Sequence, residues 1–216
     1  KLKEFAQIDT LEKVSGEIKL NLSYEGSFED IGNIKASDFE RCTASGSLAL
    51  LNGSGKLKGI EKEASNINGK LLFDNNNANL QELSFKRNNS TSVKLSGVAQ
   101  NIFGYFFKPE EKLELDASLT AGKLNIEDVL FKTVEENNKE ATPFSLPPRV
   151  IANLQIKADT VLFKKFEARQ LTGIASMKNN TLSLENVSFQ TADGNIKGDA
   201  ILKGFPDKTF GVDATA

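Results

Sequence analysis

The sequence of 216 residues predicts a mainly β protein: a curved antiparallel meander sheet that forms a groove or half-open barrel, with one or two short helices. Three observations predict it. Apolar residues alternate with polar ones in about a dozen segments, Gly, Asn or Asp separates these segments at a spacing of 8 to 12 residues, and one long stretch is similar to another stretch further along the chain. The sheet is therefore expected to consist of repeated strand units.

The strands are expected wherever the period of two appears. In GEIKLNLSYEG, the apolar residues Ile18, Leu20, Leu22 and Tyr24 alternate with polar ones, which is typical of a strand with one buried face. The same alternation continues through Leu48 and Leu50; Leu71 and Phe73; Val93 and Leu95; Leu113, Leu115, Ala117 and Leu119; Val150, Ala152, Leu154, Ile156 and Ala158; Val161 and Phe163; Leu182 and Leu184; and Phe210, Val212 and Ala214.

Helix signals are few and short. FAQIDTLEKV (residues 5–14) has apolar residues at helical spacing, and NIEDVLFK (125–132) begins with Asn125, which suits a helix N-cap. NIFGYFF (101–107) is a third candidate. Each of the three segments is also compatible with an irregular strand or a turn.

The best candidate boundary is a polar, acidic, Pro-terminated loop at residues 132–149. It separates a first β-repeat region (1–131) from a second β-repeat region (150–216). We expect the second region to continue the same sheet, so that the chain is one structural domain.

The repeat appears when residues 67–85 (INGKLLFDNNNANLQELSF) are laid over residues 171–189 (LTGIASMKNNTLSLENVSF). Four equivalent pairs are 104 positions apart: Gly69 and Gly173, Leu80 and Leu184, Leu83 and Val187, Phe85 and Phe189. Each unit is interpreted as strand, turn, strand, turn, strand, with the Asn residues at 75–77 and 179–180 in the turns. Asn suits tight turns because it tolerates a positive φ.

Composition argues against several functions. With 27 Lys and Arg against 29 Asp and Glu, the net charge is −2, so nucleic acid is not an expected partner. The chain has no His and one Cys, which removes imidazole bases, disulfides and the usual zinc clusters. Cys42 is given no role. The sequence predicts no enzyme activity, no catalytic residue, no cofactor and no metal.

The apolar sides of the strands are the candidate site. Two arrangements are compatible with the alternation: the apolar residues meet one another in a closed core, or a curved sheet leaves them as an open channel. No long amphipathic helix is predicted to cover such a sheet. The candidate lipid-contact residues are Leu71, Phe73, Leu83, Phe85, Val93, Leu95, Leu154, Ile156, Leu182, Leu184, Val187 and Phe189.

A family resemblance rests on LPPRVIANLQIKADTV, the following LTG, NNTLSLENVSF and DGNIKGDAIL. These segments resemble the C-terminal region of AsmA-like proteins of Gram-negative envelopes, which are related to TamB. The matching positions are Asn180, Leu182, Leu184, Gly194, Ile196 and Gly198; where the family often has Gly-Gly, this chain has Asp193-Gly194. The resemblance extends over residues 146–204 and, less closely, over 67–131.

The resemblance implies a periplasmic β-groove that carries phospholipid and supports outer-membrane homeostasis, with envelope proteins of both membranes as partners. It also implies an N-terminal membrane anchor. The longest apolar run, at residues 102–107, is far shorter than the ~20 residues of a spanning helix, and the sequence begins with Lys1, so we expect a fragment from which the anchor is missing. Two alternatives remain: a closed structural β module that binds protein partners at its sheet edges, and a closed lipocalin-like barrel.

Overall fold

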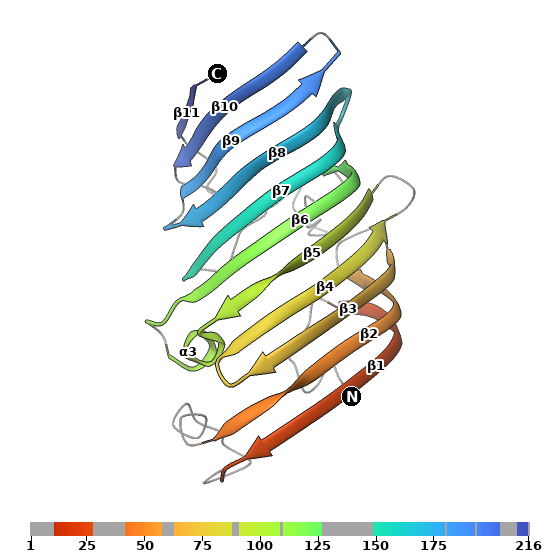
Figure 1. The fold of residues 1–216 in the computed structure, drawn as a ribbon, viewed down its shortest axis with the longest axis vertical. Helices are drawn as coiled ribbons and strands as arrows, with labels where there is room; N and C mark the ends of the chain where they lie inside the picture. Colours follow the sequence, from red (N-terminus) through yellow and green to blue (C-terminus); the bar gives the residue numbers. More distant parts are fainter. Residues whose placement is uncertain are drawn as a thin grey trace, which may run out of the picture.

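The structure, a computed structural model, describes residues 11–27, 42–57, 63–87, 91–108, 110–126, 149–179, 181–192, 194–203 and 211–215. The described residues form a single sheet of eleven strands, in which the spatial order follows the chain from β1 to β11 (Figure 1). The strands are β1 (Leu11–Glu25), β2 (Thr43–Leu57), β3 (Ala64–Asp74), β4 (Asn77–Arg87), β5 (Thr91–Gln100), β6 (Leu113–Asn125), β7 (Val150–Phe163), β8 (Phe166–Lys178), β9 (Thr181–Thr191), β10 (Gly194–Lys203) and β11 (Gly211–Thr215). The predicted mainly β class is confirmed.

One strand pair differs from the predicted antiparallel meander. Nine of the ten neighbouring pairs are antiparallel, but β6 and β7 are parallel, with Leu113 opposite Val150 and Asn125 opposite Leu162. Alternation sets which face a residue occupies but not the direction of its strand, so the sequence pattern did not reveal this pair. The predicted polar loop at 132–149 lies outside the described residues except for Arg149. Strands from both sides of it belong to the same sheet.

The helix predictions had mixed outcomes. The six residues of α3 (Ile102–Phe107) form a helix, as NIFGYFF allowed. The N-terminal helix prediction is wrong from Leu11 onward, because those residues form β1 and Leu11 is opposite Leu57 of β2. Ladder hydrogen bonds outweigh a short amphipathic pattern there. The remainder of that segment, and residues 127–132 of NIEDVLFK, lie outside the described residues.

The predicted turns and several bulges contain Asn in the left-handed region. Asn75 and Asn179, in the two predicted Asn turns, have φ of 47° and 50°. Asn66 in β3 and Asn186 in β9 have φ of 52° and 53° at places where the strand register shifts. A bulge inserts one extra residue, so the side chains beyond it change face relative to a strict alternation. Asn tolerates this backbone because its side chain is short and polar.

Asn186 offers a test of the bulge in β9. Its side chain is exposed and its backbone N–H donates to Asp199 Oδ1 at 2.7 Å. Replacing Asn186 with Val should lower the free energy of unfolding by roughly 1–2 kcal/mol, because a β-branched residue is strained at positive φ. Replacing Asn186 with Gly should leave stability almost unchanged. Urea unfolding followed by circular dichroism measures both; equal effects of the two substitutions would contradict a left-handed residue at this position.

Arg149 joins the start of β7 to α3 and to the segment that follows it. Its guanidinium donates to the carbonyl oxygens of Lys108 (2.8 Å), Glu111 (2.6 Å) and Tyr105 (3.0 Å), and it lies 4.7 Å from the centre of the Tyr105 ring. The Arg149 carbonyl oxygen accepts from the backbone N–H of Leu113, the first residue of β6. Arg149 therefore helps to align the parallel pair through both its backbone and its side chain.

Removing the Arg149 guanidinium should weaken this end of the sheet. Hydrogen bonds to a charged group contribute about 1.5–3 kcal/mol, so Arg149→Ala is expected to lower the free energy of unfolding by an amount in this range. Arg149→Lys should recover only part of the loss, because an ammonium group cannot reproduce the planar fork. Thermal unfolding of the three proteins measures this order; a lysine variant as stable as the original would argue against the fork geometry.

The most buried residues lie where β5, β6, β7 and β8 meet. Val93, Ala121, Leu124, Ala158, Val161 and Ala168 form this cluster, and Phe85, Leu119, Ile126, Leu171 and Phe189 pack against it. Small side chains are frequent in the cluster, since three of its six residues are alanines. It holds the middle of the sheet together.

Candidate functional site

A single line of apolar residues crosses the whole sheet. In a β-ladder, residues directly opposite each other have their side chains on the same face. Following these partners from β1 to β11 gives Leu20, Leu48, Leu71, Leu80, Gly97, Ala117, Leu154, Ala175, Leu184, Ala200 and Ala214. Every strand contributes one residue, and none of them is polar.

Neighbouring lines have the same character. A second complete line contains Leu22, Gly46, Phe73, Ala78, Ala99, Leu115, Ala152, Met177, Leu182, Leu202 and Val212. Shorter lines run from Ile18 through Leu50, Gly69, Leu83, Leu95, Leu119 and Ile156 to Gly173, from Phe85 through Val93, Ala121 and Ala158 to Leu171, and from Val187 to Gly198 and Phe189 to Ile196. We call these lines together the apolar face.

All twelve candidate residues lie on the apolar face. The bulges make this possible, because Leu184 and Val187, like Leu80 and Leu83, are three positions apart and a strict alternation would place them on opposite faces. Val187 is placed beside Gly173, where a Cβ built on the glycine would lie 3.2 Å from Val187 Cγ2. Five strands, β3, β4, β5, β7 and β9, carry the twelve.

The apolar face also includes residues that were not among the twelve. Alternation showed Ile18, Leu20 and Leu22, but the candidate set did not include them. The small residues Gly97, Ala117 and Ala175 were missed because Gly and Ala give a weak hydrophobic signal in a sequence. Only the register shows that they join the larger residues into unbroken lines.

Among the residues of this face whose exposure the structure describes, the most exposed lie on β1. Val93 is 4% exposed and the other eleven candidate residues are half-buried, whereas Ile18, Leu20 and Leu22 are 48%, 63% and 56% exposed. Large apolar side chains with this much exposure are unusual when they are contiguous. Apolar surface therefore remains accessible at one edge of the sheet.

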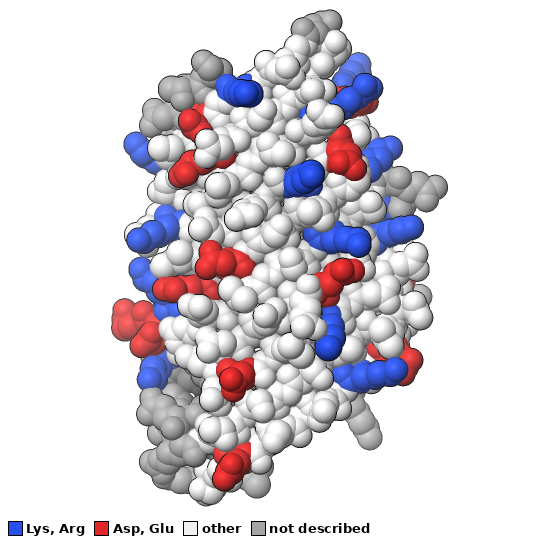
Figure 2. Space-filling view, in the orientation of Figure 1, with Lys and Arg blue, Asp and Glu red and all other residues white. Residues whose placement is uncertain are grey.

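The opposite face is polar. Lys70 lies opposite Glu82, Lys94 opposite Thr120, and Lys157 opposite Thr172. Figure 2 shows charged side chains of both signs spread among uncharged ones over the face turned toward the viewer. The sheet therefore separates a charged face from a face whose lines contain no charged residue.

In the described part of the chain, α3 is the only helix longer than one residue. All eleven strands belong to the same sheet. No helix in that part of the chain is long and apolar enough to cross a membrane. The described residues contain no group of three or more Cys, Asp or Glu side chains placed to hold a metal ion. The apolar face is the feature that stands out.

Comparisons of the chain with known protein families, with curated proteins and with solved structures found no match. The class of protein is therefore defined here by the fold and the site: an open, single-layer β-sheet with one apolar and one charged face.

Proposed function

We propose that the chain is a non-enzymatic part of an AsmA-like envelope protein and holds phospholipid acyl chains in an apolar β-groove. The observation that supports this most is the pair of complete apolar lines, which cross eleven strands without a charged or polar residue. A surface of this kind binds chains of methylene groups without any specific polar contact.

Burial of methylene groups alone provides enough free energy to hold an acyl chain on the apolar face. Burying one methylene group contributes about 0.8 kcal/mol, so a few buried methylenes already give useful affinity. Neighbouring strands are about 4.8 Å apart, so eleven strands span roughly 48 Å. One acyl chain occupies about half of a ~30 Å bilayer core. The face is therefore long enough for an acyl chain to lie across several strands.

An open groove suits the sheet better than a closed structure does. The sheet is twisted and bent, and its two edge strands, β1 and β11, are at opposite ends of the strand order (Figure 1). A lipocalin-like barrel needs these edges to pair, and a sandwich needs a second sheet. The strands that the structure describes form neither arrangement.

Two repeated units would explain how such a groove is lengthened. The bounds of β4 and β9 are 104 residues apart at both ends, and each strand carries a bulge after the equivalent residues Leu80 and Leu184. The equivalent glycines also face equivalent partners, since a Cβ on Gly69 would lie 3.1 Å from Leu83 Cδ1 and a Cβ on Gly173 would lie 3.2 Å from Val187 Cγ2. These correspondences support duplication of one strand unit.

The AsmA-like assignment itself rests on the sequence resemblance. If it holds, the chain acts in the periplasm, next to envelope proteins of the inner and outer membranes, and an N-terminal anchor tethers the whole protein. These partners and this location are part of the proposal.

Native mass spectrometry after incubation with mixed phospholipid vesicles tests the proposal. We expect adducts at phospholipid masses, which are absent from a buffer control and from a sample incubated with soluble headgroups alone. A bare protein mass under all conditions would contradict acyl-chain binding.

The exposed edge gives the second candidate function, a structural module that recruits a protein strand. β1 has fifteen residues, and among the described strands it pairs only with β2. Its apolar side chains Ile18, Leu20 and Leu22 are 48%, 63% and 56% exposed. Strand addition needs such an edge. A proline at a β1 residue whose backbone N–H points away from β2 would prevent strand addition. It would leave acyl-chain binding in place, so the two functions are separable.

A further inference from the structure

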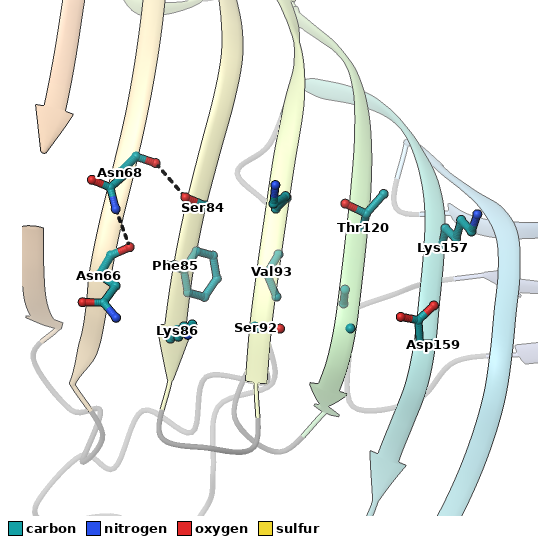
Figure 3. A pocket seen from close by; sticks show the side chains of 13 residues that line it. Asn66, Asn68, Ser84, Phe85, Lys86, Ser92, Val93, Thr120, Lys157 and Asp159 are labelled. Atoms are coloured by element: carbon teal, nitrogen blue, oxygen red, sulfur yellow. Dashed lines mark hydrogen bonds between the residues drawn. The ribbon is translucent and has the colours of Figure 1, made fainter. Parts of the chain in front are cut away.

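A hollow of about 580 Å³ lies on the polar face, over β3 to β7 (Figure 3). Its floor contains the small residues Ser92, Thr120 and Gly122. A Cβ built on Gly122 would meet Ser92 Oγ alone, at 3.5 Å. The glycine therefore leaves room above the strands, where a side chain would otherwise stand.

Three lysines are among the residues that line the hollow. Lys86 lies opposite Ser92, Lys94 opposite Thr120, and Thr120 opposite Lys157, so the three lysines come from β4, β5 and β7, with Ser92 and Thr120 beside them in the ladders. Asp159 is the one acidic residue of the lining. Three lysines and one aspartate give a local charge of +2 in a chain whose net charge is −2.

The lysines are available to a ligand. Within the described residues, Lys86 and Lys157 have no ion pair and no side-chain hydrogen bond. Lys94 is 3.9 Å from Glu82, but these side chains are 67% and 59% exposed, and an exposed pair at this distance contributes little. An anion can therefore compete with Glu82 at small cost.

The wall on the β3 side is already fixed. Asn68 Oδ1 accepts from the backbone N–H of Asn52 at 2.9 Å, and Asn68 Nδ2 donates to the Asn66 carbonyl oxygen at 3.0 Å. The Asn68 carbonyl oxygen accepts from Ser84 Oγ at 3.5 Å (Figure 3). Both polar ends of this side chain are occupied within the protein, so it shapes the hollow and leaves ligand binding to the lysines and hydroxyls.

We propose that this hollow binds a phosphate group. Ammonium groups approach a tetrahedral oxyanion from several sides as point charges, and serine and threonine hydroxyls donate to the remaining oxygens. The phosphate belongs either to a small soluble molecule or to a lipid headgroup. The site lies on the face opposite the apolar lines, so it does not depend on acyl-chain binding.

The test is a titration of the ¹⁵N-labelled protein with inorganic phosphate at constant ionic strength, followed by amide chemical shifts. We expect saturable shifts confined to the amides of the hollow. The double variant Lys86→Gln/Lys157→Gln should weaken binding about tenfold or more, since two charge-assisted contacts are lost. Lys197→Gln is the matched control, because Lys197 is an exposed lysine on the same face, opposite Ser188. It should bind phosphate as the original protein does.

Gly122→Leu tests the shape of the hollow without changing charge. The leucine should cover the floor of the hollow beside Ser92 and remove most of the saturable shifts, while the circular dichroism spectrum stays unchanged. Shifts that grow linearly with phosphate, or an equal loss in Lys197→Gln, or unaltered binding in Gly122→Leu would overturn the proposal.

A second set of samples identifies the source of the phosphate. Flotation with phosphatidic acid vesicles, compared with phosphatidylcholine vesicles, should be lost in the double variant if the ligand is a headgroup. Phosphate binding without flotation assigns the hollow to a soluble phosphate compound. Acyl-chain adducts in native mass spectrometry should persist in the double variant, which keeps this test separate from that of the proposed function.

Discussion

Leu184→Asp is expected to abolish lipid adducts in native mass spectrometry while the β circular dichroism spectrum is retained. Leu184 is half-buried in the first complete line, between Ala175 and Ala200. A carboxylate there must be desolvated when an acyl chain covers it, which costs several kcal/mol. A cost of about 3 kcal/mol lowers affinity roughly a hundredfold.

The matched control is Ser183→Asp. Ser183 precedes Leu184 in β9, is also half-buried, and lies opposite Ser176 and Ile201 on the polar face. The Ser183→Asp variant should keep its phospholipid adducts. Leu20→Asp, at a 63% exposed position of β1, repeats the test where loss of the fold is not expected. Equal adducts for Leu184→Asp and Ser183→Asp would remove the basis for binding on the apolar face.

Gly97→Val should cause a large loss of stability. A Cβ at position 97 would lie 2.8 Å from Ala117 Cα, 2.9 Å from Ala117 Cβ and against the Asp116 carbonyl oxygen. These are atoms of the neighbouring strand β6, so β5 and β6 must separate to admit a side chain. Overpacking typically costs roughly 1–3 kcal/mol, and we expect the upper end because backbone must move.

Gly122→Val is the control for Gly97→Val, since a side chain at position 122 has space. Urea unfolding of the two variants should show a large fall in midpoint for Gly97→Val and almost none for Gly122→Val. The reverse order would mean that β5 and β6 are not in the register described here.

Much of the sheet was predictable because the apolar alternation is local. Ile18, Leu20 and Leu22 indicated β1 from their spacing alone, and the Asn turns at Asn75 and Asn179 lie where they were expected. The direction of β7 relative to β6 was not predictable, because it depends on how a long connection returns the chain. That information is not in the alternation.

The site was predictable in part, for the same reason. The twelve candidate residues share one face, but the lines that join them depend on small residues such as Gly97 and Ala175, whose role appears only in the register. The hollow on the polar face was not predicted from the sequence, because Lys86, Lys94 and Lys157 come from three strands and only the sheet brings them together. The spacing of three residues between Leu184 and Val187 could have indicated the bulge, because a strict alternation places apolar residues two apart.

The most direct test of the lipid-binding face is a photo-crosslinking scan along β9. Benzoylphenylalanine is placed in turn at each position from Thr181 to Thr191, and the protein is irradiated with phospholipid vesicles. We predict lipid crosslinks at positions 182, 184, 187 and 189 and weak ones at 183, 185, 188 and 190, because the bulge at Asn186 changes the phase of the strand. Crosslinks of equal yield at all positions, or at the polar positions alone, would contradict an acyl chain lying on the apolar face.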